Sequence, residues 1–220
     1  MKRSSQSRLF SCSAVVLVAA FAARADDSAT SVPETIPNFV MRDVDGVKHE
    51  LYDYADSKAI VLFFQMNGCP IVRQSYPYFE EIKEAYAEKG VTFLYVNSNK
   101  WDTPESVIEE RADFLFTPPV LSEPYRALAH YLQVERSADT FVINPAQNWR
   151  IVYHGMADDR FDYGLQRMSP KKFWLRDALD AILAGEEPAH SETVAKGCLI
   201  DMDTYQGVAF VKHVKPILQT

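Results

Sequence analysis

The residue with the clearest chemical potential in this sequence is Cys69. It follows the apolar run at 59–65 by four residues and stands directly before Pro70. A continuous apolar run is typical of a buried strand, and proline is favoured at the first position of a helix. Free amide N–H groups and the helix dipole at such a junction stabilise the thiolate, which is the nucleophilic form of cysteine. We therefore expect Cys69 to be a redox nucleophile that is at least partly exposed and has a lowered pKa. Arg73, one helical turn on, would add a stabilising positive charge.

Two other cysteines, Cys12 and Cys198, accompany Cys69, and neither forms a C-x-x-C pair with it. Three roles stay open for Cys198. It resolves an oxidised Cys69 into an intramolecular disulfide, it forms a permanent structural disulfide, or it remains a buried free thiol. Separation along the chain does not distinguish these roles, because it says nothing about distance in space.

The segment 1–25 has the pattern of a secretory signal peptide. Three basic residues lie within 1–8, an apolar stretch covers 9–23, and Ala23-Arg24-Ala25 matches a signal-peptidase site. The apolar stretch is shorter than the roughly 20 residues that span a membrane. We expect a secreted, periplasmic protein whose mature chain starts near Asp26 and has lost Cys12 with the signal peptide.

Removal of the signal peptide makes the protein more acidic. The whole chain has a formal net charge of −7, and loss of the four basic residues in 1–25 leaves −11. A chain this acidic is a poor partner for nucleic acid or for an anionic membrane surface. We expect no nucleic-acid partner and, after signal cleavage, no membrane partner.

Hydrophobic periodicity and turn signals divide the rest of the chain into strands and helices. Strands are expected at 38–40, 59–65, 91–97, 118–121, 140–143 and 150–154, and helices at 70–89, 103–114, 125–132 and 170–184. Pro77 should kink the first helix. The order is a βαβ unit followed by ββα, which predicts an α/β fold with a central mixed β-sheet flanked by helices. We expect residues 26–36 to be an exposed lead-in, 37–185 the domain, and 186–220, where the periodicity ends, a C-terminal extension.

Several short runs together resemble the redoxin family. In chain order they are FQMNGCPIVR at 64–73, VNSN at 96–99, YHG at 153–155, DDR at 158–160 and GCLI at 197–200. They are similar to the alkyl hydroperoxide reductase/thiol-specific antioxidant branch of the thioredoxin superfamily, and within it to a peroxiredoxin-like subgroup. The resemblance implies a thioredoxin-like fold and a thiol-dependent oxidoreductase in cell redox homeostasis, in which Cys69 attacks a peroxide or a protein disulfide. It also implies that a reducing partner protein supplies the electrons and that no bound cofactor is required.

The chain departs from that family at the positions that assist the reaction. Peroxiredoxins place a threonine three residues before the reactive cysteine, where this chain has Met66. Just before the strand expected at 140–143, peroxiredoxins place an arginine and thioredoxins a cis-proline. This chain has Ala138 there, with Arg136 two residues earlier. We therefore expect slow peroxide reduction and favour disulfide exchange. The predicted site comprises Cys69, Cys198 and Arg73, supported by Asn67, Gly68, Pro70 and Arg136, with no metal.

A non-enzymatic interpretation stays open beside this one, namely a degenerate thioredoxin-like binding or assembly module that handles copper. Thiolate and imidazole suit copper, so Cys69, Cys198 and His154 are its candidate ligands. A lone histidine at a strand end is more often a hydrogen-bonded structural residue than a ligand or a base. The segment 208–218 is similar to the entry segment of a c-type cytochrome-like domain, although an ordinary C-terminal segment explains it equally well.

Overall fold

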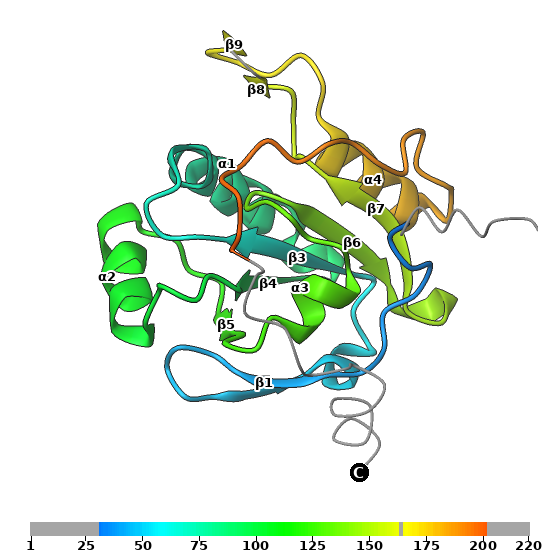
Figure 1. Ribbon diagram of the computed structural model, residues 1–220. Coiled ribbons are helices and arrows are strands. Elements are labelled where there is room, and N and C mark those ends of the chain that lie inside the picture. The colour runs from blue at the N-terminus through cyan, green and yellow to red at the C-terminus, as the bar shows by residue number, and fades with distance from the viewer. Residues whose placement is uncertain (1–30, 163–164, 202–220) are drawn as a thin grey trace, which may run out of the picture.

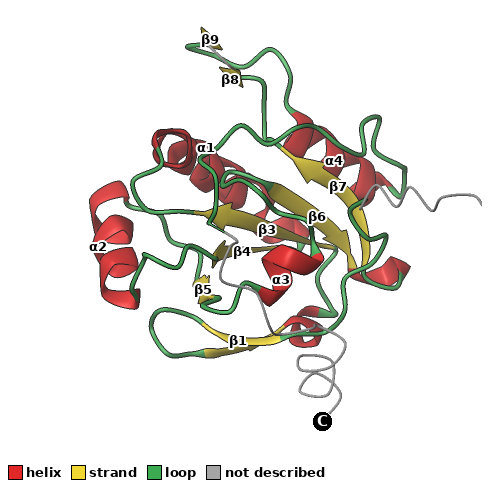
Figure 2. Cartoon of the chain, viewed as in Figure 1, coloured by secondary structure: helices red, strands yellow, loops and turns green. Residues whose placement is uncertain are grey.

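The computed structural model describes residues 31–162 and 165–201, which form a mixed five-stranded sheet with helices on both faces (Figures 1 and 2). Its strands are β3 (Ala59–Gln65), β4 (Val91–Asn97), β5 (Val120–Ser122), β6 (Thr140–Asn144) and β7 (Arg150–Gly155). They lie in the order β5-β4-β3-β6-β7, with β3, β4 and β5 parallel and β6 and β7 each antiparallel to its neighbour. The helices are α1 (Pro70–Tyr86), α2 (Pro104–Phe114), α3 (Ala127–Tyr131) and α4 (Trp174–Ala184). The predicted central mixed sheet flanked by helices is confirmed.

The central strand β3 supplies both hydrophobic cores of the protein. All seven of its residues are buried, as the continuous apolar run predicted. Successive side chains of a strand point to opposite faces, so Val61 and Phe63 pack with α1 and α4. Ile60 and Leu62 pack on the other face with α3 and the N-terminal segment. The sheet edge at which β3 ends is therefore held rigidly from both sides.

Helix α1 begins where the sequence predicted. Cys69 is its N-cap and Pro70 its first residue, after a turn in which Gly68 adopts a φ of 74°. Glycine reaches this left-handed conformation without steric cost, which lets the chain turn sharply from β3 into the helix. The helix runs past Pro77 to Tyr86, and a short 3-10 turn then leads to the expected stop at Gly90.

Some boundaries differ from the expectation. Helix α4 starts at Trp174 rather than at residue 170, because the Asp159 carboxylate accepts hydrogen bonds from the amides of Lys171 and Lys172 and holds that stretch in a turn. The strand expected at 38–40 lies at Val40–Arg42 as β1 and pairs with β2 (Lys48–Glu50), a strand that was not expected. The hairpin of β8 (Phe161–Asp162) and β9 (Leu165–Gln166) was not expected either, because strands this short carry no pattern.

The expected exposed lead-in is only partly exposed. Thr35 forms a β-bridge with Arg150, and the Ile36 amide donates to the Trp149 carbonyl at 3.0 Å, which buries the Ile36 side chain. The predicted signal peptide at 1–25 and the tail segment 208–218 lie outside the described residues. Within 31–162 and 165–201, no helix is both long enough and apolar enough to cross a bilayer.

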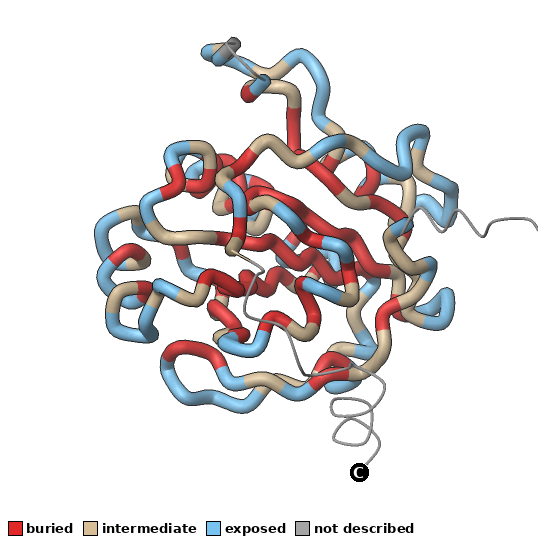
Figure 3. The backbone as a smooth tube through the Cα atoms, viewed as in Figure 1, coloured by how far each residue is buried: buried red, intermediate tan, exposed pale blue. Residues whose placement is uncertain are grey.

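The C-terminal extension folds back over the sheet rather than leaving the domain. We call residues 191–200 the strap, which crosses the ends of β7 and β3 in orange in Figure 1. Its first part pairs with β7, where the His154 amide donates to the Ser191 carbonyl at 3.0 Å. Its last part pairs with the segment before β6, where the Ser137 amide donates to the Cys198 carbonyl at 2.9 Å. Most of the strap is exposed or half-buried, and its buried residues are Gly197 and Ile200 (Figure 3).

Glu123, which follows β5, has a consequence for the pH dependence of stability. It is fully buried, and burial raises its pKa to about 7, although hydrogen bonds from Ser98 and from the amides of Leu128 and Ala129 oppose the rise. The folded protein therefore keeps a proton that the unfolded chain releases above about pH 4.5.

We predict that the free energy of unfolding falls as pH rises from about 4.5 to 7, with on the order of 3 kcal/mol of the fall due to Glu123. Urea unfolding of the wild type and of Glu123→Gln across this range tests it. The variant should show the shallower slope, and Glu88→Gln, at an exposed site, should match the wild type. Equal slopes for wild type and Glu123→Gln would contradict the assignment.

Candidate active site

Cys69 lies at the carboxyl end of β3, as expected, but its side chain is buried. Only 1% of the residue is exposed, so the expectation of partial exposure is wrong. The reason is the strap, whose Cys198 amide donates to the Cys69 Sγ atom at 3.4 Å. On another side the Ser137 hydroxyl donates to the same sulfur at 3.2 Å. The thiol at the helix N-terminus is therefore enclosed by hydrogen-bond donors.

The strap brings Cys198 against Cys69 although 129 residues separate them. Both cysteines are free thiols, and the backbone amide of Cys198 and the hydroxyl of Ser137 both donate to Cys69 Sγ. The sequence left the distance in space between the two cysteines open, because nothing in their spacing fixes the path of the strap. The pair is placed for chemistry between the two sulfurs.

The surroundings separate the pKa values of the two thiols. Burial by itself raises the pKa of Cys69, but hydrogen bonds from Ser137, from the Cys198 side chain and from the amides of Val72 and Cys198 outweigh it, and the net shift is downward. Burial raises the pKa of Cys198 to about 11, and the neighbouring Cys69 adds to the rise. Cys69 therefore ionises before Cys198, and the thiolate is the nucleophilic form of cysteine.

Ser137 is a functional residue that the sequence analysis missed. It is fully buried, and its hydroxyl both donates to Cys69 Sγ and accepts from the Cys198 amide at 3.0 Å. It thus links the two cysteines. A serine in a loop carries no signal of its own. Its place directly before Ala138, the position that the family uses to assist the reaction, is the only hint in the sequence.

Gly197 allows the strap to approach this segment closely. A Cβ atom on Gly197 would lie 1.9 Å from the Ser137 carbonyl oxygen, which no side chain tolerates. Gly155 has the same role at the other end, where a Cβ would lie 2.3 Å from the Thr193 carbonyl oxygen. Only glycine lets two backbones meet at this distance, so both residues determine where the strap sits.

The loop before Cys69 is anchored by the segment that joins β4 to α2 and by α2 itself. The Asn67 amide donates to Asp102 Oδ2 at 2.9 Å, and the Gly68 amide donates to Glu110 Oε1 at 3.2 Å. The Arg73 guanidinium pairs with Glu110 at 2.6 Å. Arg73 is therefore a positioning residue that helps to hold the loop, in place of the direct action on the thiolate that we expected. Asp102 and Glu110 are further residues that the sequence analysis missed.

Arg136, like Arg73, makes no hydrogen bond to the Cys69 sulfur and instead contacts the backbone of the strap. Its Nη1 atom donates to the Gly197 carbonyl at 3.0 Å, which fixes the strap beside the cysteines. Its positive charge opposes the rise in the Cys198 pKa. Met66, at the position of the missing threonine, contributes only its carbonyl, which accepts from the Cys69 amide at 3.3 Å.

His154 does not join the cysteines. Its ring stacks on Phe141, and its Nε2 atom lies 3.6 Å from the Glu192 carboxylate. Burial lowers the pKa of His154 despite the nearby Glu192, so the imidazole is uncharged at neutral pH. Within the described part of the chain, no three metal-ligating side chains gather where they could hold an ion. The copper site that Cys69, Cys198 and His154 would have formed is not assembled.

We predict that Ser137→Ala raises the pKa of Cys69, because it removes one of the hydrogen bonds that stabilise the thiolate. The rate of alkylation against pH, measured in a Cys198→Ser background, gives the midpoint with and without the serine hydroxyl. Ser57→Ala, remote from the cysteines, is the control. A midpoint that Ser137→Ala leaves unchanged would contradict this role.

Known proteins resemble this chain in sequence and in fold. A thiol-disulfide oxidoreductase, ResA, from Geobacillus thermodenitrificans is 29% identical over 120 residues, which cover 54% of this chain and 67% of that protein. The crystal structure of a hypothetical protein from Sinorhizobium meliloti superposes with a TM-score of 0.68 at 26% identity, covering 77% of this chain and 93% of that one. An uncharacterized conserved protein from Geobacillus kaustophilus gives a TM-score of 0.69 at 25% identity, covering 82% and 96%. The fold is thioredoxin-like, as the resemblance implied. The AhpC/TSA family model matches residues 32–152, more than half of the sequence, and the chain belongs to the AhpC/TSA family.

Proposed function

We propose that this protein is a thiol–disulfide oxidoreductase in which Cys69 is the nucleophile and Cys198 resolves the reaction. The observation that carries the proposal is the contact between the two free cysteines, in which the Cys198 amide donates to Cys69 Sγ at 3.4 Å. The unequal pKa values support it, since one thiol ionises readily and the other stays protonated. The likeness to proteins named thiol-disulfide oxidoreductase points to the same reaction class.

The chemistry proceeds in two exchanges. The Cys69 thiolate attacks one sulfur of a partner protein's disulfide, an S–S bond forms between the two chains, and the other partner sulfur leaves as a thiolate. Cys198 then loses its proton to solvent or to that thiolate and attacks Cys69 Sγ. This step forms the Cys69–Cys198 disulfide and releases the second partner thiol. The partner gains two electrons from the cysteine pair. A reducing protein then supplies two electrons that convert the Cys69–Cys198 disulfide back to two thiols. No bound cofactor is needed for these steps.

A protein disulfide fits this site better than a peroxide does. Peroxide reduction needs polar groups that orient the peroxide and stabilise the departing oxygen. At the two positions where the family provides them, this chain has Met66 and Ala138. Ser137 supplies the one side-chain hydroxyl on the sulfur, and Arg136 is engaged with the strap.

The proposed setting is the periplasm. Disulfide exchange between proteins belongs to oxidising compartments, and the N-terminal sequence has the pattern of a secretory signal. We therefore propose a secreted protein that acts on other exported proteins.

The proposed function predicts that Cys198→Ser accumulates a mixed disulfide, because the resolving thiol is missing while the nucleophile remains. Reduced protein is incubated with an oxidised, disulfide-bonded model protein, quenched with acid and examined by non-reducing electrophoresis and mass spectrometry. Cys69→Ser is the matched control and should form no adduct. Equal adduct formation by both variants, or by neither, would overturn the assignment of roles.

We also predict slow oxidation by hydrogen peroxide. Loss of one preorganised polar group typically costs about a hundredfold or more in rate, and two such groups are absent. Stopped-flow oxidation of the reduced wild type, compared with an efficient peroxiredoxin under the same conditions, should show a rate at least about a hundredfold lower. Matching rates would show that Ser137 or another group has taken over the missing roles.

A further inference from the structure

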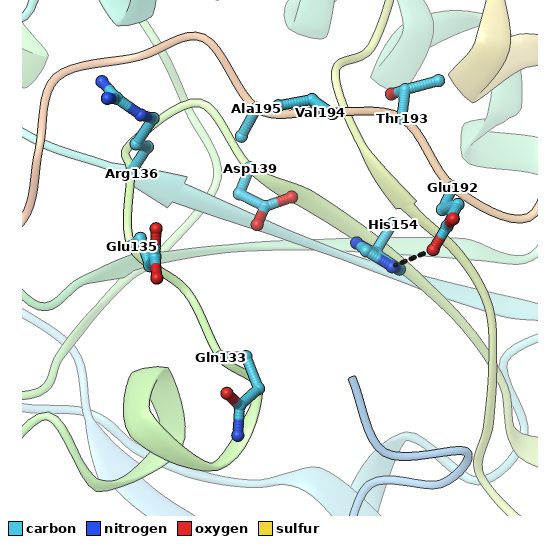
Figure 4. A pocket seen from close by; sticks show the side chains of 9 residues that line it. All are labelled: Gln133, Glu135, Arg136, Asp139, His154, Glu192, Thr193, Val194 and Ala195. Carbon is cyan, nitrogen blue, oxygen red and sulfur yellow. Dashed lines mark ion pairs between the residues drawn. The ribbon is translucent and has the colours of Figure 1, made fainter. Parts of the chain in front are cut away.

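A solvent-open cleft of about 360 Å³ lies between the strap and the segment before β6, and the exchange steps do not use it. Figure 4 shows the side chains around it. The strap forms one wall, and the segment that leads into β6, together with β7, forms the other. Among the residues that line it are Gln133, Glu135, Asp139, His154, Glu192 and Ala195.

The unusual group in this cleft is the carboxyl of Asp139. The residue is only 8% exposed, and its Oδ1 atom accepts no hydrogen bond from the rest of the described chain. Figure 4 places the carboxyl between Ala195 and His154, facing the space between the walls. Burial raises the pKa of Asp139 to about 7, although hydrogen bonds from the backbone of Thr140 and Gly155 oppose the rise. These bonds leave Oδ1 unpaired and bring no positive charge, and a buried carboxylate without a countercharge is costly, so the group lacks the cation that would make its charge favourable.

No positive side chain of the cleft supplies that cation. Arg136 points away from Asp139 in Figure 4 and donates to the Gly197 carbonyl. His154 is uncharged at neutral pH, because burial lowers its pKa. Glu135 and Glu192 are exposed at the rim and add two more carboxylates. The cleft therefore offers a buried acceptor behind an acidic rim, and an entering cation would restore the charge of Asp139.

The cation must bring its own hydrogen-bond donors. Within the described residues no group of three ligating side chains could hold a metal ion, so a bare metal has too few ligands here. An ammonium or guanidinium group carries both the charge and directed N–H donors, which suit a carboxylate. The side chains of lysine and arginine end in such groups, and their long apolar stems can pass Val194 and Ala195 on the strap.

The position of the cleft indicates what carries this cation. Asp139 is two residues beyond Ser137, whose hydroxyl donates to Cys69 Sγ. With that 3.2 Å contact, two residues of at most about 3.3 Å each and the lengths of the two side chains, the carboxyl lies no more than roughly 16 Å from the Cys69 sulfur. A polypeptide whose cysteine is at Cys69 can therefore reach Asp139 with a side chain two or three residues away.

We propose that this cleft is a specificity pocket for a lysine or arginine side chain near the reactive cysteine of the partner protein, with Asp139 as its buried anchor. The inference rests on the proposed disulfide exchange and adds a substrate class to it, namely polypeptides with a basic residue beside the exchanged cysteine. Such a preference also suits the acidic charge of the whole chain.

The test uses three short peptides that differ at one position, two residues from a single cysteine, where they carry lysine, norleucine or glutamate. Each peptide is prepared as a mixed disulfide with thionitrobenzoate, and its exchange with reduced protein is followed by thionitrobenzoate release. The lysine peptide should react about tenfold faster than the norleucine peptide with the wild type, and the glutamate peptide more slowly than both. Asp139→Asn should remove the difference between the lysine and norleucine rates, whereas Glu88→Gln should keep it.

A second measurement separates recognition from chemistry. The same peptides with serine in place of cysteine are labelled with a fluorophore, and their binding to reduced protein is measured by anisotropy. The lysine peptide should bind about tenfold more tightly than the norleucine peptide, again through Asp139. Equal binding and equal rates for all three peptides would overturn the pocket and leave the exchange function standing. A lysine preference that survives Asp139→Asn would also overturn it. Selective binding with no exchange of any peptide would instead overturn the proposed function and keep the cation site.

Discussion

The contact between the strap and the segment before β6 is the interaction on which the rest of the site depends. The Ser137 amide and the Cys198 carbonyl pair at 2.9 Å, while the Ser137 hydroxyl links the Cys198 amide to Cys69. This small junction closes the nucleophile off from solvent, places the second thiol against it and forms one wall of the acidic cleft. The burial of Cys69, its contact with Cys198 and the proposed pocket for a basic side chain therefore have a common structural cause.

The junction also creates a conflict within the site. Enclosure removes water from Cys69, which disfavours the thiolate, and the hydrogen bonds within the enclosure more than compensate. The same enclosure keeps a protein substrate away from the sulfur. The proposed exchange therefore needs the Cys198 end of the strap to lift, which costs the backbone hydrogen bonds that join Cys198 to Ser137 and Ile200 to Glu135. Leu199 at this end buries little, since it is 63% exposed. Segments with few buried apolar contacts open at a low free-energy cost.

The opposite wall of the site is built to stay in place. The loop that carries Cys69 is tied to Asp102 and Glu110, and Glu110 is itself paired with Arg73 on α1. Strand β3 behind the loop is buried along its whole length. A firmly held Cys69 thus faces a lightly held strap that carries Cys198. This arrangement suits the proposed two-step exchange, because the Cys69 sulfur, which attacks in the first step and is attacked in the second, keeps its position while Cys198 moves.

The sequence by itself determined the parts of the protein that depend on local patterns. The apolar run at 59–65, the Gly68 turn and Pro70 are adjacent in the chain, so their preferences predict a buried strand that leads into a helix with Cys69 at its start. The βαβ and ββα order follows in the same way, and with it the mixed sheet. These features are set by neighbours a few residues apart.

Only the tertiary structure decided the surroundings of the cysteine. The burial of Cys69, its contact with Cys198, the pairing of Arg73 with Glu110 and the unpaired Oδ1 atom of Asp139 all depend on residues distant in sequence. The strap has no hydrophobic periodicity from which its path could be predicted. Its position is fixed by two glycines that admit close backbone contact and by hydrogen bonds to β7 and to the loop before β6. Such contacts exist only once the chain has folded, because their partners are brought together by the sheet.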